Sequence, residues 1–281
     1  FEGFVPFLRV YEAATTVLQT PEDFKRLGLA ILEEAASNGV IYMESFVSPD
    51  FCGGGDVTAW REYLAAMVEA ADKAERDFGI VSRGIVTCIR HEGPDQAKTA
   101  ALCAAETVGE FITGFGMGGD ENKGHQRDFK YSFDMAREAG LRLTTHAGEW
   151  RGPQEVRDAV NDLGVERVGH GVRASEDPAL VDELAEKGIV LEVCPGSNVA
   201  LGAYTDWKSH PIDMLRRAGV KVTVSTDDPP FFHTTMRDEY FNLANTFGWD
   251  AEVFMAIAKA SANAAFCDDA TRAKILKTLE S

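Results

Sequence analysis

The sequence predicts an α/β protein in which parallel strands alternate with helices, and a (β/α)₈ barrel of the TIM type is the expected fold class. Two observations support this class. Short apolar runs rich in β-branched residues recur along the chain, and each follows a helical pattern that ends in Gly. The runs are almost continuously apolar, which is typical of parallel strands buried on both faces. A doubly wound sheet is the alternative, but no Gly-x-Gly-x-x-Gly motif opens a helix after the first strand, which disfavours its dinucleotide-binding form.

The elements can be placed in order along the chain. The chain opens on an amphipathic helical pattern, "FEGFVPFLRVYEAA", and a second helix begins at Thr20, where Pro21 and two acidic residues follow the capping position. An alanine-rich helix opens after Pro94. Seven strands are expected, at residues 40–47, 80–89, 111–117, 141–147, 165–171, 189–195 and 220–228. A barrel of this kind needs eight strands, so either the count is one short or the first strand lies upstream of Phe1.

Composition narrows the class of protein. The chain has 281 residues, is 45% hydrophobic and contains no linker-like or low-complexity tract, so a single domain over residues 1–281 is expected. A formal charge of -17 argues against nucleic acid or an anionic membrane surface as a partner and favours a small neutral or cationic substrate. The five cysteines are widely spaced and form no Cys-x-x-Cys, which predicts reduced thiols in a cytoplasmic protein.

Unusual polar residues follow the predicted strands. In a βα barrel the site forms at the carboxyl ends of the strands, and the residues found there are His146, Glu149, His170, Asp227 and Asp228. Each has an ordinary structural interpretation when taken alone, since a strand-end His is usually hydrogen-bonded and an Asp before Pro commonly forms a turn. Their joint placement at one rim is what indicates a site. Ordinary structural or surface roles are expected for Cys194, His91, His125, His210 and His233.

The combination of His and Asp ligands suits zinc or a similar transition metal, with one position left open for water in a catalytic site. Such a metal lowers the pKa of bound water towards about 7. A divalent cation would also explain why Asp227 and Asp228 stand side by side at the end of a buried strand, because it compensates their like charges. Asp227 and one of the two strand-end histidines would be ligands, which is fewer than the three or four protein ligands of a typical zinc site.

Four ordered motifs resemble the adenosine and adenine deaminase family of the metal-dependent hydrolase superfamily. They are "THAGEW" at 145–150, "RVGHGVRA" at 167–174, "LEVCPGSN" at 191–198 and "VSTDDP" at 224–229, and "GFGMGGDE" at 114–121 is similar to a further family segment. The likeness covers essentially the whole chain.

The resemblance implies one zinc ion per chain, bound by His146 and Asp227. It implies that Glu149 donates a proton to ring nitrogen 1 of the purine and that His170 acts on the water at the metal. Asp228 would orient that water and contact ring nitrogen 7. Gly119 would contact ring nitrogen 3 through its backbone.

The opening helix resembles the lid of the family, in which Phe4, Val5 and Leu8 would form an apolar gate over the substrate; ordinary helix packing is the alternative. Two departures stand out. The His-x-His zinc-ligand pair of the family is absent, so we expect it in a segment that precedes Phe1. Gly116 also stands where many relatives carry Asp.

These features predict a zinc-dependent deaminase that converts adenosine to inosine and ammonia, because the "HAGEW" loop followed by "RGPQEVRDAV" looks more like the adenosine branch. The alternatives are deamination of adenine or of a modified adenosine such as aminodeoxyfutalosine, another metal-dependent hydrolysis of an amide or ring, and a non-catalytic purine-binding homologue that lacks the His-x-His ligands. The cytidine type of zinc deaminase is disfavoured because it uses a Cys-x-x-Cys.

Overall fold

The structure is a computed structural model that describes residues 3–280. The described residues divide into two compact units, an N-terminal unit formed by Leu8–Leu143 and a C-terminal unit formed by residues 144–280 with residues 3–7. The expectation of one domain over residues 1–281 stays a prediction. Within the described residues, no helix is both long and apolar enough to cross a membrane.

The strands confirm the predicted fold class. The sheet contains seven strands among the described residues, in the order β1-β2-β3-β4-β5-β6-β7, and the pairing is parallel throughout. Parallel strands that neighbour one another in chain order, with helices between them, have the connectivity of a TIM-type barrel. The number of strands is the number that the apolar runs predict.

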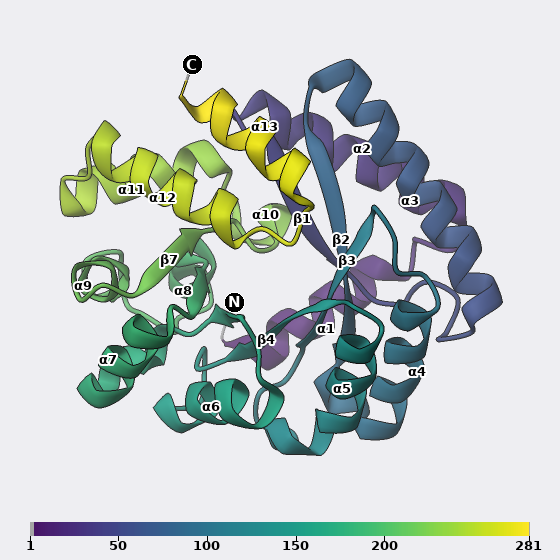
Figure 1. Cartoon of the computed structure of the whole chain (residues 1–281), viewed down its shortest axis with the longest axis horizontal. Coiled ribbons are helices and arrows are strands. Elements are labelled where there is room, and N and C mark those ends of the chain that lie inside the picture. The colour runs from purple at the N-terminus through teal and green to yellow at the C-terminus, as the bar shows by residue number, and fades with distance from the viewer. Residues whose placement is uncertain (1–2, 281) are drawn as a thin grey trace. The chain divides into compact units, whose positions relative to one another are not determined.

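The N-terminal unit contains the first three strands and the start of the fourth. Its elements are α1 (Phe4–Thr15, whose first turn belongs to the other unit), α2 (Pro21–Ser37), β1 (Tyr42–Val47), α3 (Val57–Phe78), β2 (Val81–Ile89), η1 (Arg90–Glu92), α4 (Pro94–Ala105), β3 (Ile112–Gly118), η2 (Gln126–Phe129) and α5 (Lys130–Glu138). Helix α2 begins as predicted, because Thr20 and Asp23 form a reciprocal capping box and Pro21 occupies the first turn. Helices α2 and α3 pack against each other (Figure 1).

The core of this unit is formed in part by apolar side chains from the faces of α2 and α3 that pack together. Leu32 of α2 and Ala74 of α3 are buried together with Ile80, which precedes β2. Helix α3 ends at Gly79 with φ 74°, a left-handed conformation that glycine adopts without steric cost. The chain can therefore turn from α3 directly into the buried strand β2.

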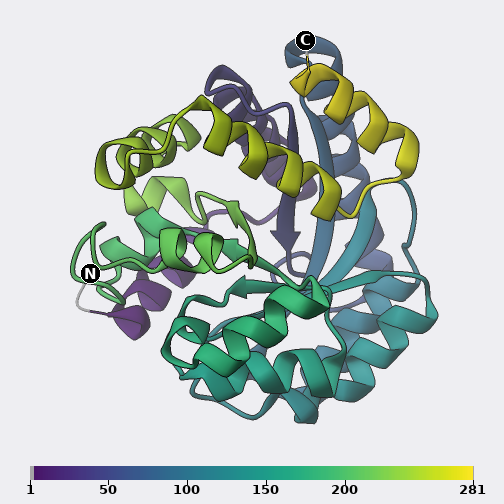
Figure 2. The same cartoon turned by 60° about the vertical axis from the view of Figure 1, so that its left-hand side comes forward.

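The C-terminal unit contains the remaining strands. Its elements are β4 (Arg142–Ala147, from Thr144 onward), α6 (Pro153–Asp158), η3 (Ala159–Leu163), β5 (Arg167–His170), η4 (Val172–Glu176), α7 (Pro178–Lys187), β6 (Val190–Val193), α8 (Pro195–Ala200), α9 (Ile212–Arg217), β7 (Lys221–Val224), α10 (Pro229–Phe232), α11 (Met236–Phe247), α12 (Ala251–Ala264) and α13 (Asp269–Leu279). Helix α12 packs against β7 and against α13 (Figures 1 and 2).

A buried polar layer joins three neighbouring strands of this unit. The Nε of Arg167 lies 2.6 Å from Oε1 of Glu192, and the Thr144 hydroxyl donates to Oε2 of the same carboxylate at 2.8 Å. The Arg167 guanidinium also lies 3.4 Å from the ring centroid of Phe266 and donates to the backbone oxygen of Ala264 at 3.0 Å. These contacts tie β4, β5 and β6 to the end of α12.

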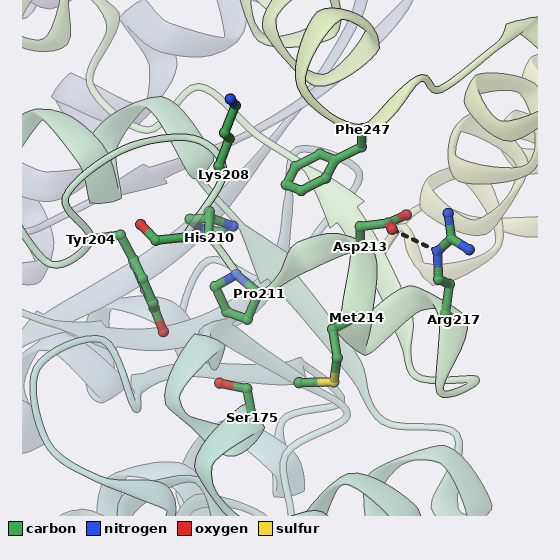
Figure 3. A pocket seen from close by; sticks show the side chains of 10 residues that line it. Ser175, Tyr204, Lys208, His210, Pro211, Asp213, Met214, Arg217 and Phe247 are labelled. Carbon is green, nitrogen blue, oxygen red and sulfur yellow. Dashed lines mark hydrogen bonds and ion pairs between the residues drawn. The ribbon is translucent and has the colours of Figure 1, made fainter.

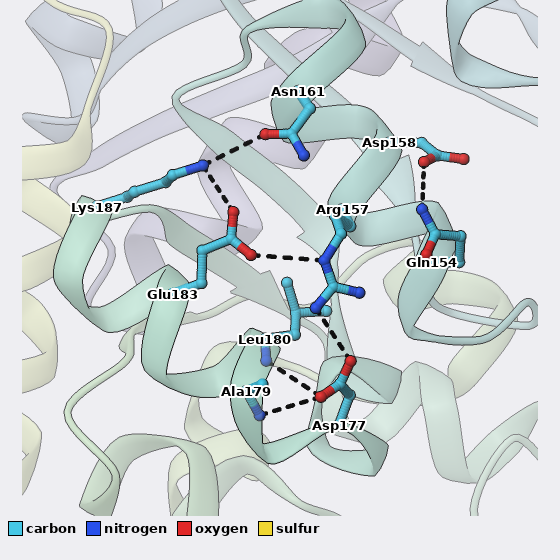
Figure 4. Close-up of polar contacts among 9 residues, drawn as sticks. All are labelled: Gln154, Arg157, Asp158, Asn161, Asp177, Ala179, Leu180, Glu183 and Lys187. Carbon is cyan, nitrogen blue, oxygen red and sulfur yellow. Dashed lines mark hydrogen bonds and ion pairs between the residues drawn. The ribbon is translucent and has the colours of Figure 1, made fainter.

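Helix α7, which separates β5 from β6, is anchored by charged side chains (Figure 4). Asp177 caps its first turn by accepting from the backbone N–H groups of Ala179 and Leu180. Arg157 donates to Asp177 at 3.0 Å and lies 3.5 Å from Glu183. These contacts hold α6 and α7 together.

Candidate active site

His146 and Glu149 come from the end of β4 and the turn after it. Gly148 has φ 69°, and a Cβ at this position would lie 2.4 Å from Val156, so only glycine fits the turn. The turn is tied to the chain after β5, because Gly171 donates its N–H to the Ala147 oxygen at 3.1 Å. Glu149 is 5% exposed. Local sequence thus places a buried carboxyl group just beyond the strand that carries His146.

His170 lies at the centre of the predicted polar residues. Its Nε2 is 3.8 Å from Oε2 of Glu149 and 3.8 Å from Oδ2 of Asp227, and its ring centroid is 5.2 Å from that of His146. The structure therefore brings three predicted residues around His170, from the ends of β4 and β7 to the end of β5. Burial lowers the pKa of His170 to about 4 against the opposing effect of the Asp227 charge, so the imidazole is neutral at neutral pH.

The two adjacent aspartates follow β7. Asp227 has φ 57°, and its Oδ2 accepts a hydrogen bond from the Ser197 hydroxyl at 2.6 Å. Burial, followed by the charge of Asp227 and a hydrogen bond with it, raises the pKa of Asp228 well above its usual value. Like charges at this spacing cannot both be stable without a compensating cation or proton. The pair thus has the electrostatic character expected of a cation site.

Candidate metal-ligating atoms gather at this rim. One ligand atom each from His170, Cys194 and Asp227 lies within 4.8 Å of the others. The Cys194 thiol is buried, and burial together with nearby carboxylates raises its pKa well above the usual range, so it stays protonated. A thiol is a poor ligand in comparison with a thiolate. The donor set that remains is imidazole and carboxylate, which fits zinc or a related divalent ion.

Three residues of the site were not singled out by the sequence patterns. Ser197 and Asn198 are fully buried in α8, where Ser197 contacts Asp227 and the Asn198 amide lies 3.1 Å from Nδ1 of His170. His210, which was expected to be structural or on the surface, is 2% exposed and lies 3.1 Å from the oxygen of the Asn198 amide. Ser197 and Asn198 lie within the motif "LEVCPGSN", which contributed only to the family resemblance. No local sequence pattern points to His210.

Glu239 is a further buried acid near these residues. It belongs to α11, is 0% exposed, and accepts hydrogen bonds from the Gly196 N–H at 3.1 Å and from the Thr234 hydroxyl at 2.7 Å. A Cβ at Gly196 would lie 2.1 Å from the Glu239 carboxylate, so a larger residue here would displace that carboxylate. The Glu239 carboxylate therefore anchors the start of α8, the helix that presents Ser197 and Asn198 to the site.

Aromatic residues of the first turn of α1 contact the loops of the site. The ring of Phe4 lies 5.8 Å from that of Trp150, the residue after Glu149. Phe7, which is 4% exposed, lies 5.1 Å from the ring of Phe232 in the short helix that follows the aspartate pair. Phe7 is thus the buried anchor of this turn, whereas Val5 is 46% exposed. The gate role expected for Phe4 stays a prediction.

Two predicted substrate-contacting residues belong to the N-terminal unit. Leu8 lies in α1, and Gly119 follows β3 with φ 104°. Within that unit, a Cβ at Gly119 would lie 2.7 Å from Nδ1 of His91, and the next residue, Asp120, donates its N–H to this nitrogen. His91 thus has the structural role that was expected of it. The substrate contacts of Leu8 and Gly119 stay predictions.

Comparison with known proteins places the chain in a family. The family model described as adenosine deaminase matches residues 1–281. The chain is 43% identical over 280 residues to an adenine deaminase of Chelativorans sp., which covers 100% of this chain and 86% of that protein. It is 45% identical over 281 residues to an adenine deaminase of Rhizobium rhizogenes, with 99% of this chain and 86% of that protein covered.

Solved structures agree with these relatives. The adenine deaminase of Arthrobacter aurescens is 31% identical with a TM-score of 0.92, and the match covers 100% of this chain and 85% of that one. An amidohydrolase of Burkhoderia ambifaria with bound Zn is 30% identical with a TM-score of 0.81, and the match covers 93% of this chain and 76% of that one. The chain therefore belongs to the adenosine deaminase family, as its motifs suggest, and is a hydrolase that deaminates a purine amidine.

Proposed function

We propose that this enzyme hydrolyses adenine to hypoxanthine and ammonia. The relatives that share 43–45% of their residues with nearly the whole chain are adenine deaminases, and this supports the base over the nucleoside adenosine, our first expectation. The structural observation that carries the proposal is the position of the His170 Nε2, 3.8 Å from carboxylate oxygens of both Glu149 and Asp227. An imidazole between two acids can donate or accept hydrogen bonds to both. Such a group suits a site that must protonate a purine ring and position a water.

The proposed metal is zinc, one ion per chain, held by His146 and Asp227. The donor chemistry fits, because imidazole and carboxylate flank His170 and because the aspartate pair calls for a cation. When bound, the ion would supply a water of lowered pKa as the nucleophile. The Ser197 hydroxyl supports this arrangement by holding the Asp227 carboxylate from the side of α8.

The chain's own residues would perform the proton transfers. Attack of water at carbon 6 requires a proton on ring nitrogen 1, and we assign its donation to Glu149, whose carboxyl is buried and next to His170. His170, which is neutral at neutral pH, would hydrogen-bond to the attacking water, and Asp228 would orient this water and contact ring nitrogen 7. Of the two protons of the water, one would pass to the amine at carbon 6, which leaves as ammonia, and the other would return to Glu149 to replace the proton given to ring nitrogen 1.

The test compares substrates on metal-loaded protein. Ammonia release should give a kcat/KM for adenine at least about 10²-fold above that for adenosine, because a pocket that fits the base lacks room or partners for the ribose. Aminodeoxyfutalosine and unrelated amides serve as further substrates. A preference for adenosine would overturn the proposal, and no turnover of any purine would favour the non-catalytic homologue. A cytoplasmic location stays a prediction.

A further inference from the structure

A line of hydrogen bonds runs inward from α9 to His170. The backbone N–H of Ile212 donates to Nδ1 of His210 at 3.3 Å. A backbone N–H can only donate, so Nδ1 of His210 carries no proton, and the single proton of the neutral ring lies on Nε2. Burial keeps this ring neutral, since it lowers the pKa of His210 to about 3.

The proton on His210 determines the orientation of the next group. Its Nε2 lies 3.1 Å from Oδ1 of Asn198, and the N–H must be the donor in this contact. The Asn198 amide is therefore turned with its oxygen towards His210 and its NH₂ group towards His170, whose Nδ1 lies 3.1 Å away. The exposures of His210, Asn198 and His170 are 2%, 0% and 2%, so solvent offers none of them a substitute partner.

We infer that Asn198 and His210 are positioning residues that hold His170 in the tautomer with its proton on Nε2. Because Nδ1 of His170 accepts from the Asn198 amide, its N–H points at the carboxylates of Glu149 and Asp227. In the opposite tautomer, a lone pair on Nε2 would face the Asp227 carboxylate with no proton between them. We call the hydrogen-bonded series His210, Asn198 and His170 the relay. It presents a hydrogen-bond donor to the reacting water, and this part of the inference rests on the proposed function.

The outer end of the relay lies in the wall of a surface pocket of about 530 Å³ (Figure 3). Tyr204 and Pro211 flank His210 there, and the Tyr204 ring lies 5.0 Å from the imidazole. Both nitrogens of His210 are already used, one by Ile212 and one by Asn198. The side chains that line the pocket therefore cover the relay, and both ring nitrogens of His210 keep their partners within the protein.

Asn198→Asp is the most direct test. The introduced carboxylate accepts from His210 as before but presents an acceptor to Nδ1 of His170, which draws a proton onto Nδ1. Two-bond ¹H–¹⁵N spectra of protein labelled with ¹⁵N-histidine report the tautomer with or without metal. The control Asn161→Asp makes the same change at an exposed site, where the side-chain oxygen accepts from Lys187 (Figure 4).

For Asn198→Asp we expect a proton on Nδ1 of His170, a kcat for adenine reduced by about 10²-fold, little change in KM, and unchanged metal content. Wild type and Asn161→Asp should both show the Nε2–H tautomer and full activity. A wild-type His170 protonated on Nδ1, or an Asn198→Asp protein that keeps the Nε2–H tautomer, would overturn the inference. So would an unchanged kcat after a change of tautomer.

A second pair of variants covers the case in which a buried Asp prevents folding. His210→Phe removes the donor to Asn198, and His210→Gln replaces it with an amide N–H. We expect the Phe variant to contain both tautomers of His170 with reduced kcat, and the Gln variant to recover the Nε2–H tautomer and most of the kcat. If His210→Gln recovers neither the Nε2–H tautomer nor the kcat, the inference of a relay is overturned. If metal-loaded wild type deaminates no purine, the proposed function fails, and the spectra alone decide the relay.

Discussion

The Nε2 of His170 lies 3.8 Å from Oδ2 of Asp227, and both residues have φ 57°, in the left-handed region that non-glycine residues rarely occupy. Such backbone conformations cost free energy and persist where the surrounding structure over-determines them. Here the surrounding contacts are the Asn198 amide on one residue and the Ser197 hydroxyl on the other. One short helix, α8, thus positions both members of the pair.

The two aspartates should respond differently to substitution. Asp227→Ala removes a proposed metal ligand, so metal content should fall to near zero along with activity. Asp228→Ala removes a group proposed to orient the water, so kcat should fall by about 10²-fold or more while metal content stays near wild type. Metal analysis and adenine turnover on the same preparations check this. Equal metal loss in both variants would contradict the division of roles.

Glu149→Gln should retain the metal and lose catalysis. The amide keeps the size of the buried side chain but cannot supply the proton, so kcat should fall by about 10²- to 10⁴-fold. Metal content and the thermal midpoint serve as controls for folding. Activity within a few-fold of wild type would rule out the proton-donor role.

Ser197→Ala should weaken metal binding without removing a ligand. It deletes the 2.6 Å hydrogen bond to Asp227, and outer-sphere contacts of this kind are worth about 10- to 100-fold in metal affinity. Competition with a chelator measures the change. Ser261→Ala is the matched control, because its hydroxyl bonds only the preceding turn of α12. Equal chelator sensitivity of the two variants would argue against the role of Ser197.

The free energy of unfolding should depend on pH because of Glu239. Burial raises the pKa of Glu239 from 4.5 to about 7, so the folded protein holds a proton that the unfolded chain releases between these values. This contribution to stability is complete below pH 4.5 and is lost as pH rises through about 7. Glu239→Gln mimics the protonated acid, so its free energy of unfolding should equal that of wild type near pH 4 and exceed it by about 3 kcal/mol at pH 8.

Denaturant unfolding of wild type and Glu239→Gln from pH 4 to 8 measures this difference. Glu138→Gln, at an exposed position, should show no comparable pH-dependent gain. A Glu239→Gln protein that is less stable than wild type at pH 8 would mean that the ionised carboxylate, with its bonds from Gly196 and Thr234, is the preferred native form.

Local sequence was enough to predict the strands and the rim that carries the site. The β-branched runs mark the strands, and Gly79 and Gly188 end helices in the left-handed conformation, because these are short-range steric effects. In parallel strands the carboxyl ends share one rim, so the order of the chain already places His146, His170 and Asp227 at strand ends.

The supporting contacts were decided by the tertiary structure. His210 reaches Asn198 across 12 residues and Glu239 reaches Gly196 across 43, and no periodicity or motif encodes such pairs. A buried His can simply pack in the core or can take part in a hydrogen-bond relay. Which of these it does depends on the atoms that its ring nitrogens contact in the folded protein. The residue types at the rim were thus readable from the sequence, whereas the tautomer of His170 follows only from the folded hydrogen-bond geometry.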